Sequence, residues 1–361
     1  DGHGYNVAIG NEALQTLNAG AHAYNVAVGF QAGHLMTTGI DNVAIGYQAL
    51  SAANAGNRSV AVGKEALLSQ NAGSAGQNMY NTAVGYRAGK SITTSTQNAI
   101  VGADAGEALT TGGNNTLIGA GSGKSLTVGV SNSALGFNAL ASAILIDRNV
   151  AIGEQALTSL VGDGSTSGQD TNNTAVGFYA GYSMTTGLSN TVIGTQAGGA
   201  ITTGSQNTFV GMQTGAANTT GLYNTAVGQH ALLTNIDGGF NTAVGMGALQ
   251  TFEPSSTNAS NTAVGMQAAK LLTTGVANTI VGALAGDAAT TGAENVLLGY
   301  AAGGLITTGN YNVVVGTLAG DALDDDSNNT IIGHGAGSAA VASNIVAVGF
   351  NAMEVATTAI R

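Results

Sequence analysis

A short repeat runs through the whole chain of 361 residues and constrains its fold more than any other feature. The repeat has the form Asn-Thr/Val-Ala-Val/Ile-Gly, and its glycine serves as an anchor for counting. Twenty anchors are present: Gly10, Gly29, Gly46, Gly63, Gly85, Gly102, Gly119, Gly136, Gly153, Gly177, Gly194, Gly211, Gly228, Gly245, Gly265, Gly282, Gly299, Gly316, Gly333 and Gly349. Fourteen of the nineteen intervals between neighbouring anchors are 17 residues long, and the others are 19, 22, 24, 20 and 16. A repeat of constant length predicts a solenoid in which each repeat forms one rung.

The irregular intervals indicate insertions. The three longest follow Gly63, Gly153 and Gly245, and their extra residues are polar and typical of loops. We therefore expect residues 1–361 to form one continuous repeat region, a segment of a longer fibre chain, with polar insertions near 68–78, 160–172 and 252–260. Because loops carry binding functions more often than regular elements, receptor contacts are expected in these insertions.

The three residues before each anchor predict a short strand. The residue directly before the anchor is always Val, Ile or Leu, and the one before that is Ala, Ile, Leu, Val or Phe. Neighbouring residues of a strand point to opposite faces, so both faces of this strand are apolar. A single thin solenoid buries only one face, and we interpret the second as a contact with other copies of the chain. The residues expected at this contact between chains are represented by Ala83, Leu117, Val192, Phe209 and Leu297.

The remaining positions predict the corners of the rung. Asn stands four residues before the anchor in eighteen of twenty repeats, and stacked Asn side chains can form a ladder. The ladder is represented by Asn42, Asn81, Asn98, Asn190, Asn207, Asn224, Asn241, Asn278 and Asn312. The anchor Gly is expected at a tight corner with positive φ, the Ala three residues later in a narrow interior, and a frequent Thr-Thr-Gly at a second corner. Together these features predict an all-β protein, a parallel β-solenoid or β-roll of about twenty 17-residue rungs with two short strands per rung.

Composition excludes several functional classes. Only 7% of the residues are charged, and a net charge of −11 with eight Lys and Arg argues against nucleic-acid binding. The absence of Cys excludes disulfides, zinc–thiolate sites and thiol nucleophiles. No stretch of about 18 apolar residues is present, so we expect no membrane insertion.

Three local features invite a functional interpretation. Residues 119–125 read Gly-Ala-Gly-Ser-Gly-Lys-Ser, but a phosphate-binding loop has four residues between its first Gly and the Gly-Lys pair, and here there are three. The consecutive acids Asp324, Asp325 and Asp326 are weak candidates for a metal site, and a solvated loop is the favoured interpretation. The five His residues are spread over distant repeats. We identify no catalytic residues and no cofactor-binding residues, and we expect the chain not to be an enzyme.

Two groups of fibrous proteins resemble this repeat. The unit Asn-x-Ala-Val/Ile-Gly-x-x-Ala is similar to the coil of trimeric autotransporter adhesin heads, which are left-handed parallel β-rolls. The fuller unit at residues 81–89, Asn-Thr-Ala-Val-Gly-Tyr-Arg-Ala-Gly, followed by Thr-Thr-Gly, resembles more closely the repeats of phage tail fibres. This resemblance covers essentially the whole chain. It implies a homotrimeric fibre on a virion surface. The expected partners are two further copies of the chain, other fibre or virion proteins, and a host cell-surface glycan or protein.

The expected function is therefore that of a structural and adhesive fibre, a shaft like that of a phage tail fibre, which supports attachment to a host cell. Two alternatives stay open. One is a bacterial surface adhesin of the trimeric autotransporter type, which a membrane-anchor domain in the full-length gene would reveal. The other is an ice-binding, Thr-rich solenoid, which an assay of thermal hysteresis would reveal.

Overall fold

The computed structural model describes residues 4–19, 22–164, 168–254, 258–339 and 342–353. In these residues the structure is all-β: it consists of short strands and turns and contains no helix. The chain divides into two compact units, Asp1–Gly187 (unit 1) and Leu188–Arg361 (unit 2). Each unit is a parallel β-solenoid, and the described residues of the two units together form about twenty rungs. The predicted all-β parallel β-solenoid of about twenty rungs is thus confirmed.

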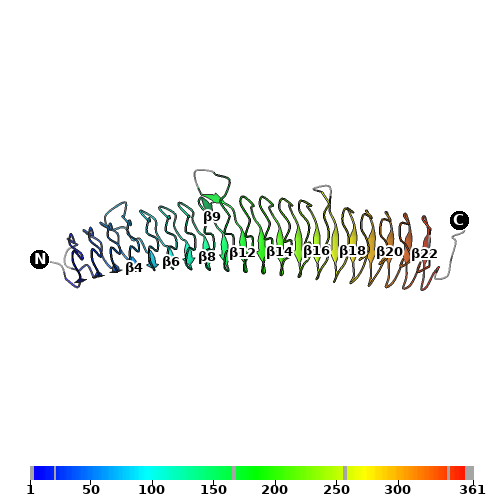
Figure 1. Ribbon diagram of the computed structural model, residues 1–361, viewed down its shortest axis with the longest axis horizontal. Coiled ribbons are helices and arrows are strands. Elements are labelled where there is room, and N and C mark those ends of the chain that lie inside the picture. The colour runs from blue at the N-terminus through cyan, green and yellow to red at the C-terminus, as the bar shows by residue number, and fades with distance from the viewer. Residues whose placement is uncertain (1–3, 20–21, 165–167, 255–257, 340–341, 354–361) are drawn as a thin grey trace. The chain divides into compact units, whose positions relative to one another are not determined.

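Unit 1 contains a stack of ten three-residue strands in its described part (Figure 1). They are β1 (Val7–Ile9), β2 (Val26–Val28), β3 (Val43–Ile45), β4 (Val60–Val62), β5 (Thr82–Val84), β6 (Ala99–Val101), β7 (Thr116–Ile118), β8 (Ser133–Leu135), β10 (Val150–Ile152) and β12 (Thr174–Val176). Successive strands pair in parallel, and residues at the same repeat position lie opposite one another. A small second sheet pairs β9 (Ile146–Asp147) with β11 (Gln169–Asp170), so the insertion at 160–172 is tied to the rung before it.

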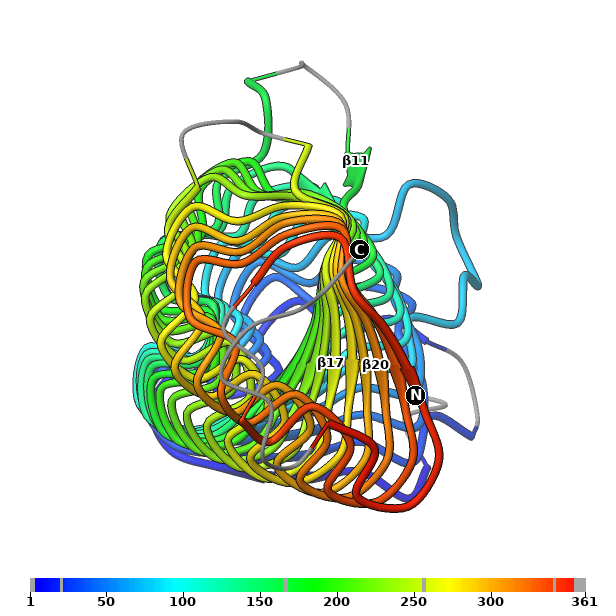
Figure 2. The ribbon, with the colours of Figure 1, turned by 90° about the vertical axis from the view of Figure 1, so that its right-hand side faces the viewer.

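Unit 2 repeats this arrangement with ten strands in its described part. They are β13 (Thr191–Ile193), β14 (Thr208–Val210), β15 (Thr225–Val227), β16 (Thr242–Val244), β17 (Thr262–Val264), β18 (Thr279–Val281), β19 (Val296–Leu298), β20 (Val313–Val315), β21 (Thr330–Ile332) and β22 (Val346–Val348). The end-on view in Figure 2 shows β17 and β20 along one side of this coil. Because every strand has the same length and register, one side of each unit is a narrow, regular sheet.

Hydrogen bonds between neighbouring rungs hold each stack together. In β7, the N–H of Thr116 donates to the carbonyl of Asn132 in the next rung at 2.8 Å. The N–H of Gly119, directly after β7, donates to the carbonyl of Val101 in the previous rung at 2.7 Å. Each rung therefore satisfies its backbone groups through the rungs on both sides, which is why the repeat must keep its length.

The predicted second strand is absent from the described rungs, apart from the short pair β9–β11. The residues after the anchor form consecutive turns instead, in which alternate residues adopt the left-handed backbone conformation. After Gly46, for example, Gln48 has φ 55° and Leu50 has φ 52°. An extended strand needs negative φ at every residue, so this prediction was wrong.

Three positions of each rung fill the interior and compensate one another in volume. They are the middle residue of the strand and the residues four and seven positions after the anchor. In one rung these are Leu117, Gly123 and Leu126, and a Cβ atom on Gly123 would lie within 3.0 Å of the Leu117 side chain. In the next rung the strand residue is Ala134 and the fourth position is Leu140, with both side chains buried. A large strand residue is thus accompanied by Gly at the fourth position, and a small one can be accompanied by Leu there, as close packing requires.

The anchor glycines are required by close contact between rungs. Gly102 has φ 140°, and a Cβ atom there would lie 2.5 Å from the carbonyl oxygen of Gly119. Real Cβ atoms do not come so close to an oxygen, and L-residues rarely adopt this backbone conformation. The predicted tight corner is confirmed, because the glycines of successive rungs lie directly above one another.

Candidate functional site

The structure reverses the predicted roles of the two strand faces. The five residues predicted to contact other chains are 0–1% exposed, because they lie in the interior of their own unit. They are Ala83, Leu117, Val192, Phe209 and Leu297. Their side chains cannot reach a second chain without unfolding the rung. The assignment was wrong because a rung closes around the middle residue of its own strand.

The outer face of the strands is a candidate interaction surface in each unit. It consists of two columns, formed by the residues three positions and one position before each anchor. The second column is apolar throughout, with Val101 38% exposed in unit 1 and Val227 37% exposed in unit 2. The first column contains Val, Thr, Ala or Ser, and no charged residue occupies either column in any repeat. We call these two columns the outer strand face.

The Asn ladder is confirmed, and it lies inside the coil. The side-chain oxygen of Asn98 accepts a hydrogen bond from the backbone N–H of Asn115 at 2.9 Å, and the Asn98 N–H donates to the side chain of Asn81 at 3.0 Å. The Asn115 amide nitrogen donates to the carbonyl of Gly129 at 2.8 Å. Asn224 and Asn241 make the same contacts in unit 2. Each Asn therefore joins its own rung to both neighbours, which is a structural role.

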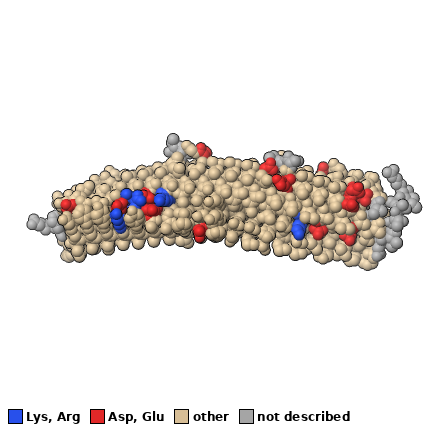
Figure 3. All heavy atoms as spheres, viewed as in Figure 1, with Lys and Arg blue, Asp and Glu red and all other residues tan. Residues whose placement is uncertain are grey.

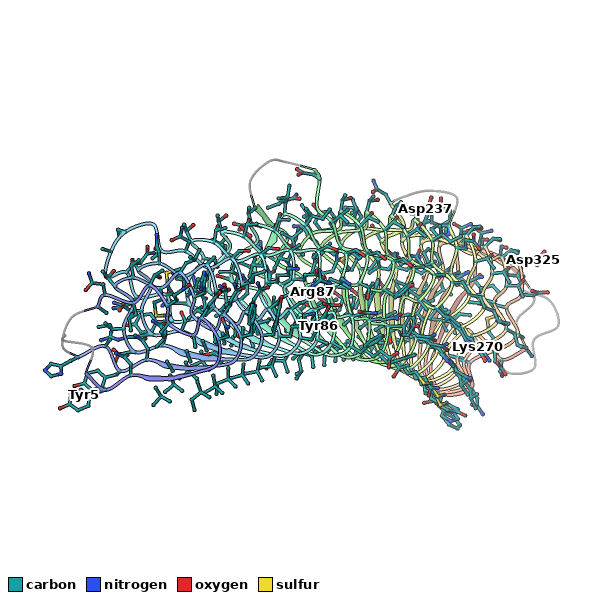
Figure 4. The ribbon with its side chains drawn as sticks, turned by 60° about the vertical axis from the view of Figure 1, so that its left-hand side comes forward. Tyr5, Tyr86, Arg87, Asp237, Lys270 and Asp325 are labelled. Atoms are coloured by element: carbon teal, nitrogen blue, oxygen red, sulfur yellow. The ribbon has the colours of Figure 1, made fainter. Side chains whose placement is uncertain are left out.

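A column of exposed aromatic rings borders the outer strand face in unit 1. The ring centroids of Phe30 and Tyr47 lie 5.4 Å apart and the rings are stacked. The ammonium group of Lys64 lies 5.4 Å from the Tyr47 centroid and 5.8 Å from the Tyr86 centroid. Figure 4 shows Tyr86 beside Arg87, whose guanidinium lies 5.7 Å from that ring. Phe30, Tyr47 and Tyr86 each occupy the position directly after an anchor, so they lie in one column, in which Lys64 lies between the last two.

Beside this column, unit 1 carries a network of ion pairs. Glu65 contacts Lys90 at 2.8 Å and Lys64 at 3.7 Å, Arg87 pairs with Glu107, and Lys124 lies 3.5 Å from Asp104. Figure 3 shows the resulting cluster of opposite charges in blue and red. The hydrogen bond from Lys90, followed by the charges of Lys90, Lys64 and Arg87, holds the pKa of Glu65 below its ordinary value. The charges compensate one another, so the network links rungs rather than presenting a net charge.

The weak metal candidates occupy a corner of unit 2 in place of Thr-Thr-Gly. The Asp324 side chain accepts a hydrogen bond from Thr307, and Ser343 donates to Asp326 at 3.3 Å. Burial, followed by the charges of Asp325 and Asp324, raises the pKa of Asp326. No group of three or more His, Cys, Asp or Glu side chains in the described ranges has the geometry to hold a metal ion. These contacts are those of a corner of the coil, so Asp324, Asp325 and Asp326 are interpreted as corner residues.

Residues 119–125 form a normal rung. The N–H groups of Gly121 and Gly123 donate to carbonyls of neighbouring rungs at 2.9 Å. Ser122 is buried at the position three residues after the anchor, which most repeats fill with Ala. Lys124 pairs with acidic side chains. These backbone donors are therefore already used and do not form a phosphate cradle.

The His residues that the structure describes lie far apart in sequence and contact neighbouring rungs. His34 lies 3.8 Å from the carboxylate of Glu12, and His230 is 2.9 Å from the side chain of Gln213. His22 stacks on Tyr5, and His334 stacks on Phe350. His3 lies outside the described residues. Each described His thus contacts a side chain of a neighbouring rung at the surface of the coil.

The Thr-Thr-Gly segments are corners, as predicted. The first Thr of each donates its hydroxyl to a carbonyl of the next rung: Thr202 to Thr219 at 3.1 Å and Thr273 to Thr290 at 3.0 Å. A different Thr array lies on the outer strand face of unit 2. It consists of six strand residues in register: Thr191, Thr208, Thr225, Thr242, Thr262 and Thr279.

Sequence reasoning missed the outer strand face, although one signal could have identified it. Where the middle strand residue is large, as in Leu117 or Phe209, a Gly follows four positions after the anchor; where it is Ala, as in Ala134, a Leu often takes that place. Such exchange of volume between two positions indicates that both face the same closed interior. The residues on either side of the middle one must then face outward.

Comparison with known proteins finds neither a family model nor a curated protein that matches this chain. In the ranges that the structure describes, no helix has the length and apolar character needed to cross a membrane.

Proposed function

We propose that the chain is a shaft segment of a homotrimeric fibre that holds attachment sites away from a virion surface and supports attachment to a host cell. The stacked rungs support this proposal, because each adds length without adding a new kind of surface. A repeated, uncharged side that is the same at every rung is suited to a mechanical role. The same proposal places the fibre outside the cell.

The observation that carries the proposal is the outer strand face. Its two columns expose apolar groups at every rung, and the outward residues of unit 2 include Leu298, which is 46% exposed. The two columns run along all ten strands in the described part of each unit, so the exposed groups form one continuous, uncharged strip. A continuous exposed apolar strip marks an interaction surface.

A second copy of the same chain is the partner that fits this face. Its spacing is set by the rungs, so another solenoid with the same spacing matches it in parallel along its whole length. The absence of charge in both columns removes the repulsion that identical charges would cause between copies. In a trimer with one common axis, the outer strand face of each chain would be covered by the other two chains.

Light scattering tests the assembly. Three chains of 35.2 kDa give 3 × 35.2 = 105.6 kDa for the expected trimer. Val227→Asp places a charge on the outer strand face without changing the interior, and we expect it to yield monomers. Thr203→Asp, at an exposed corner, is the matched control and should remain trimeric. A wild-type mass of 35.2 kDa would contradict the proposal. The full-length gene and its neighbours distinguish a virion fibre from a bacterial surface adhesin.

The Thr array of unit 2 favours one second candidate, binding to ice. Six Thr residues and the Val or Ile two positions after each form a grid, in which hydroxyl and methyl groups repeat at the strand spacing of about 4.8 Å. A regular grid of this kind can order water in a lattice. Thermal hysteresis of the wild-type protein that disappears in Thr225→Leu would support this function. Its absence, together with a trimeric mass, would leave the fibre as the function.

A further inference from the structure

A hollow beside the third insertion, in the described part of unit 2, has both apolar and polar walls. It has a volume of about 230 Å³ and is lined by Thr220, Leu222, Asp237, Phe240 and Asn258. The first four come from the corners of two successive rungs, and the last comes from the returning limb of insertion 252–260. Figure 4 shows Asp237 at the outer edge of the coil.

The described limbs of the insertion, 252–254 and 258–260, contact the neighbouring rungs. Pro254 is buried, and a Cβ atom on Gly238 would lie 2.6 Å from its ring, so Gly238 is required for this contact. Asn258 forms a parallel bridge with Gly239, and the N–H of Ala259 donates to the carbonyl of Gly239 at 3.3 Å. The N–H of Glu253 donates to the carbonyl of Thr273 in the following rung at 2.8 Å. Both limbs are thus fixed, and Asn258 is held at the rim of the hollow.

The floor of the hollow is apolar and supported from one side. Phe240 is 48% exposed, and its ring stacks on Tyr223 with centroids 4.9 Å apart. Leu222, from the previous rung, is 40% exposed. An aromatic ring that is held by a neighbour and still exposed offers a fixed apolar surface, because little conformational entropy is lost when a ligand covers it.

The rim supplies hydrogen-bonding groups of three kinds. The Asp237 carboxylate accepts hydrogen bonds, and the Thr220 hydroxyl and the Asn258 carboxamide both donate and accept. A pyranose has the matching chemistry: one face of C–H groups and a border of hydroxyls that donate and accept. The volume is below the roughly 300–1,000 Å³ of sites for larger ligands and suits one sugar ring.

The charge around the hollow selects the kind of sugar. In the described residues of unit 2, Lys270 is the one Lys or Arg, against eight Asp and Glu. Asp237 lies in the rim and Glu253 lies in the insertion. A sugar acid or a phosphorylated sugar would be repelled, whereas a neutral hexose or an N-acetylhexosamine would not.

We propose that this hollow binds one neutral pyranose residue of a glycan, with its apolar face on Phe240 and Leu222 and its hydroxyls on Asp237, Asn258 and Thr220. The proposal rests on the attachment function proposed above and names the chemical class that attachment recognises. It also assigns recognition to an insertion rather than to the regular rungs.

Saturation-transfer NMR with the full chain tests this site. The probes are methyl β-D-glucopyranoside, methyl α-D-mannopyranoside, methyl β-D-galactopyranoside and N-acetylglucosamine, with N-acetylneuraminic acid as the anionic comparison. We expect transfer to the ring C–H protons of at least one neutral probe and none to the anionic one. Phe240→Ala and Asp237→Asn should each weaken binding by about tenfold or more, as measured by titration.

Tyr311→Ala is the matched control, because Tyr311 is an exposed aromatic residue at the same repeat position as Phe240, five residues before its anchor. It should bind as the wild type does. Failure of every neutral probe, or unchanged binding in both Phe240→Ala and Asp237→Asn, would overturn the proposal. Light scattering separates the two proposals: a trimer that binds no sugar refutes this site alone, and a monomer that binds sugar refutes only the shaft.

Discussion

Units 1 and 2 use the same rung to present different surfaces. Six Lys and Arg residues lie in the described part of unit 1, and one lies in that of unit 2. The described part of unit 2 therefore has too few basic residues for an ion-pair network like the one around Glu65 and Arg87. Unit 2 carries instead the uninterrupted Thr column from Thr191 to Thr279. The anchor glycines, the Asn ladder and the compensating interior positions are shared. The difference shows that closed interior and corner positions determine this fold, while the outer positions are free to change.

The largest effect is expected at an anchor glycine, and it should be alike in both units. Gly102→Ala in unit 1 and Gly282→Ala in unit 2 would place Cβ atoms 2.5 Å and 2.1 Å from the carbonyl oxygens of the next anchors. We expect each to lower the free energy of unfolding by about 3 kcal/mol or more, as measured by chemical denaturation.

Gly76→Ala is the control for this pair. Gly76 also has positive φ, 78°, but it lies in an insertion and a Cβ atom there would meet nothing within 4 Å. Its cost should be only the backbone strain of about 1–2 kcal/mol. Equal costs at Gly76 and Gly102 would show that contact between rungs is not what requires the anchors.

The next effect has opposite signs in the two units at one repeat position, seven residues after the anchor. In unit 1 this is Gln70, whose amide donates to Ser59 at 2.8 Å and accepts from Asn81 at 2.8 Å. In unit 2 it is Asn218, a buried side chain whose oxygen and nitrogen both lack a hydrogen-bond partner. Gln70→Leu should destabilise the protein by about 1–3 kcal/mol, because it leaves two buried groups unpaired. Asn218→Leu should stabilise it by about 1–2 kcal/mol.

Thermal or denaturant unfolding of the two Leu variants measures this contrast. The alternative for Asn218 is a buried water that pairs both atoms. If Asn218→Leu destabilises the protein as much as Gln70→Leu does, the Asn218 carboxamide has hydrogen-bond partners in the folded protein.

The smallest effects concern pH, and they also differ between the units. Because the pKa of Glu65 is lowered in the folded state, its ion pairs stabilise unit 1 above the unfolded value of 4.5 and lose this effect as the pH falls through the folded value. Because the pKa of Asp326 is raised in the folded state, its charge destabilises unit 2 at neutral pH and the penalty disappears as the pH falls. Acid should therefore weaken the rungs around Glu65 and strengthen those around Asp326.

Two neutral substitutions measure these pH effects. Glu65→Gln should cost about 0.5–1 kcal/mol at pH 7 and nothing well below the unfolded pKa. Asp326→Asn should stabilise the protein slightly at pH 7 and have no effect in acid. Unfolding curves at the two pH values provide the test, and a Glu65→Gln effect that persists in acid would assign that residue a packing role.

The sequence predicts the rung better than it predicts the faces of the strand. The constant interval, the positive φ of the anchors and the ladder of Asn81 and Asn98 all follow from residue types with narrow conformational or hydrogen-bonding preferences. The inward direction of Ala83 does not follow from hydrophobicity, because its outward neighbour Val84 is the more apolar residue. In a three-residue strand that is apolar throughout, alternation carries no signal.

The turns after the anchor were also beyond prediction, for a related reason. Leu50 has φ 52°, a conformation that Leu seldom adopts, and only the bonds to neighbouring rungs make it favourable: its N–H donates to the carbonyl of Ala66 at 2.9 Å. The hollow at Phe240 depends on how insertion 252–260 lies against the rung before it, which no local pattern specifies.

Spin labels on single cysteines test the central claim most directly, because the chain has no Cys of its own. Labels would be placed on the outer strand face at Val101 in unit 1 and Val227 in unit 2, and on exposed corners at Thr94 and Thr203 as controls. If copies of the chain join through the outer strand face, the labels at both Val positions will broaden one another's spectra, dilution with unlabelled chains will remove the broadening, and the Thr labels will remain narrow. Narrow spectra at both Val positions, with broadening at the Thr positions, would contradict the account.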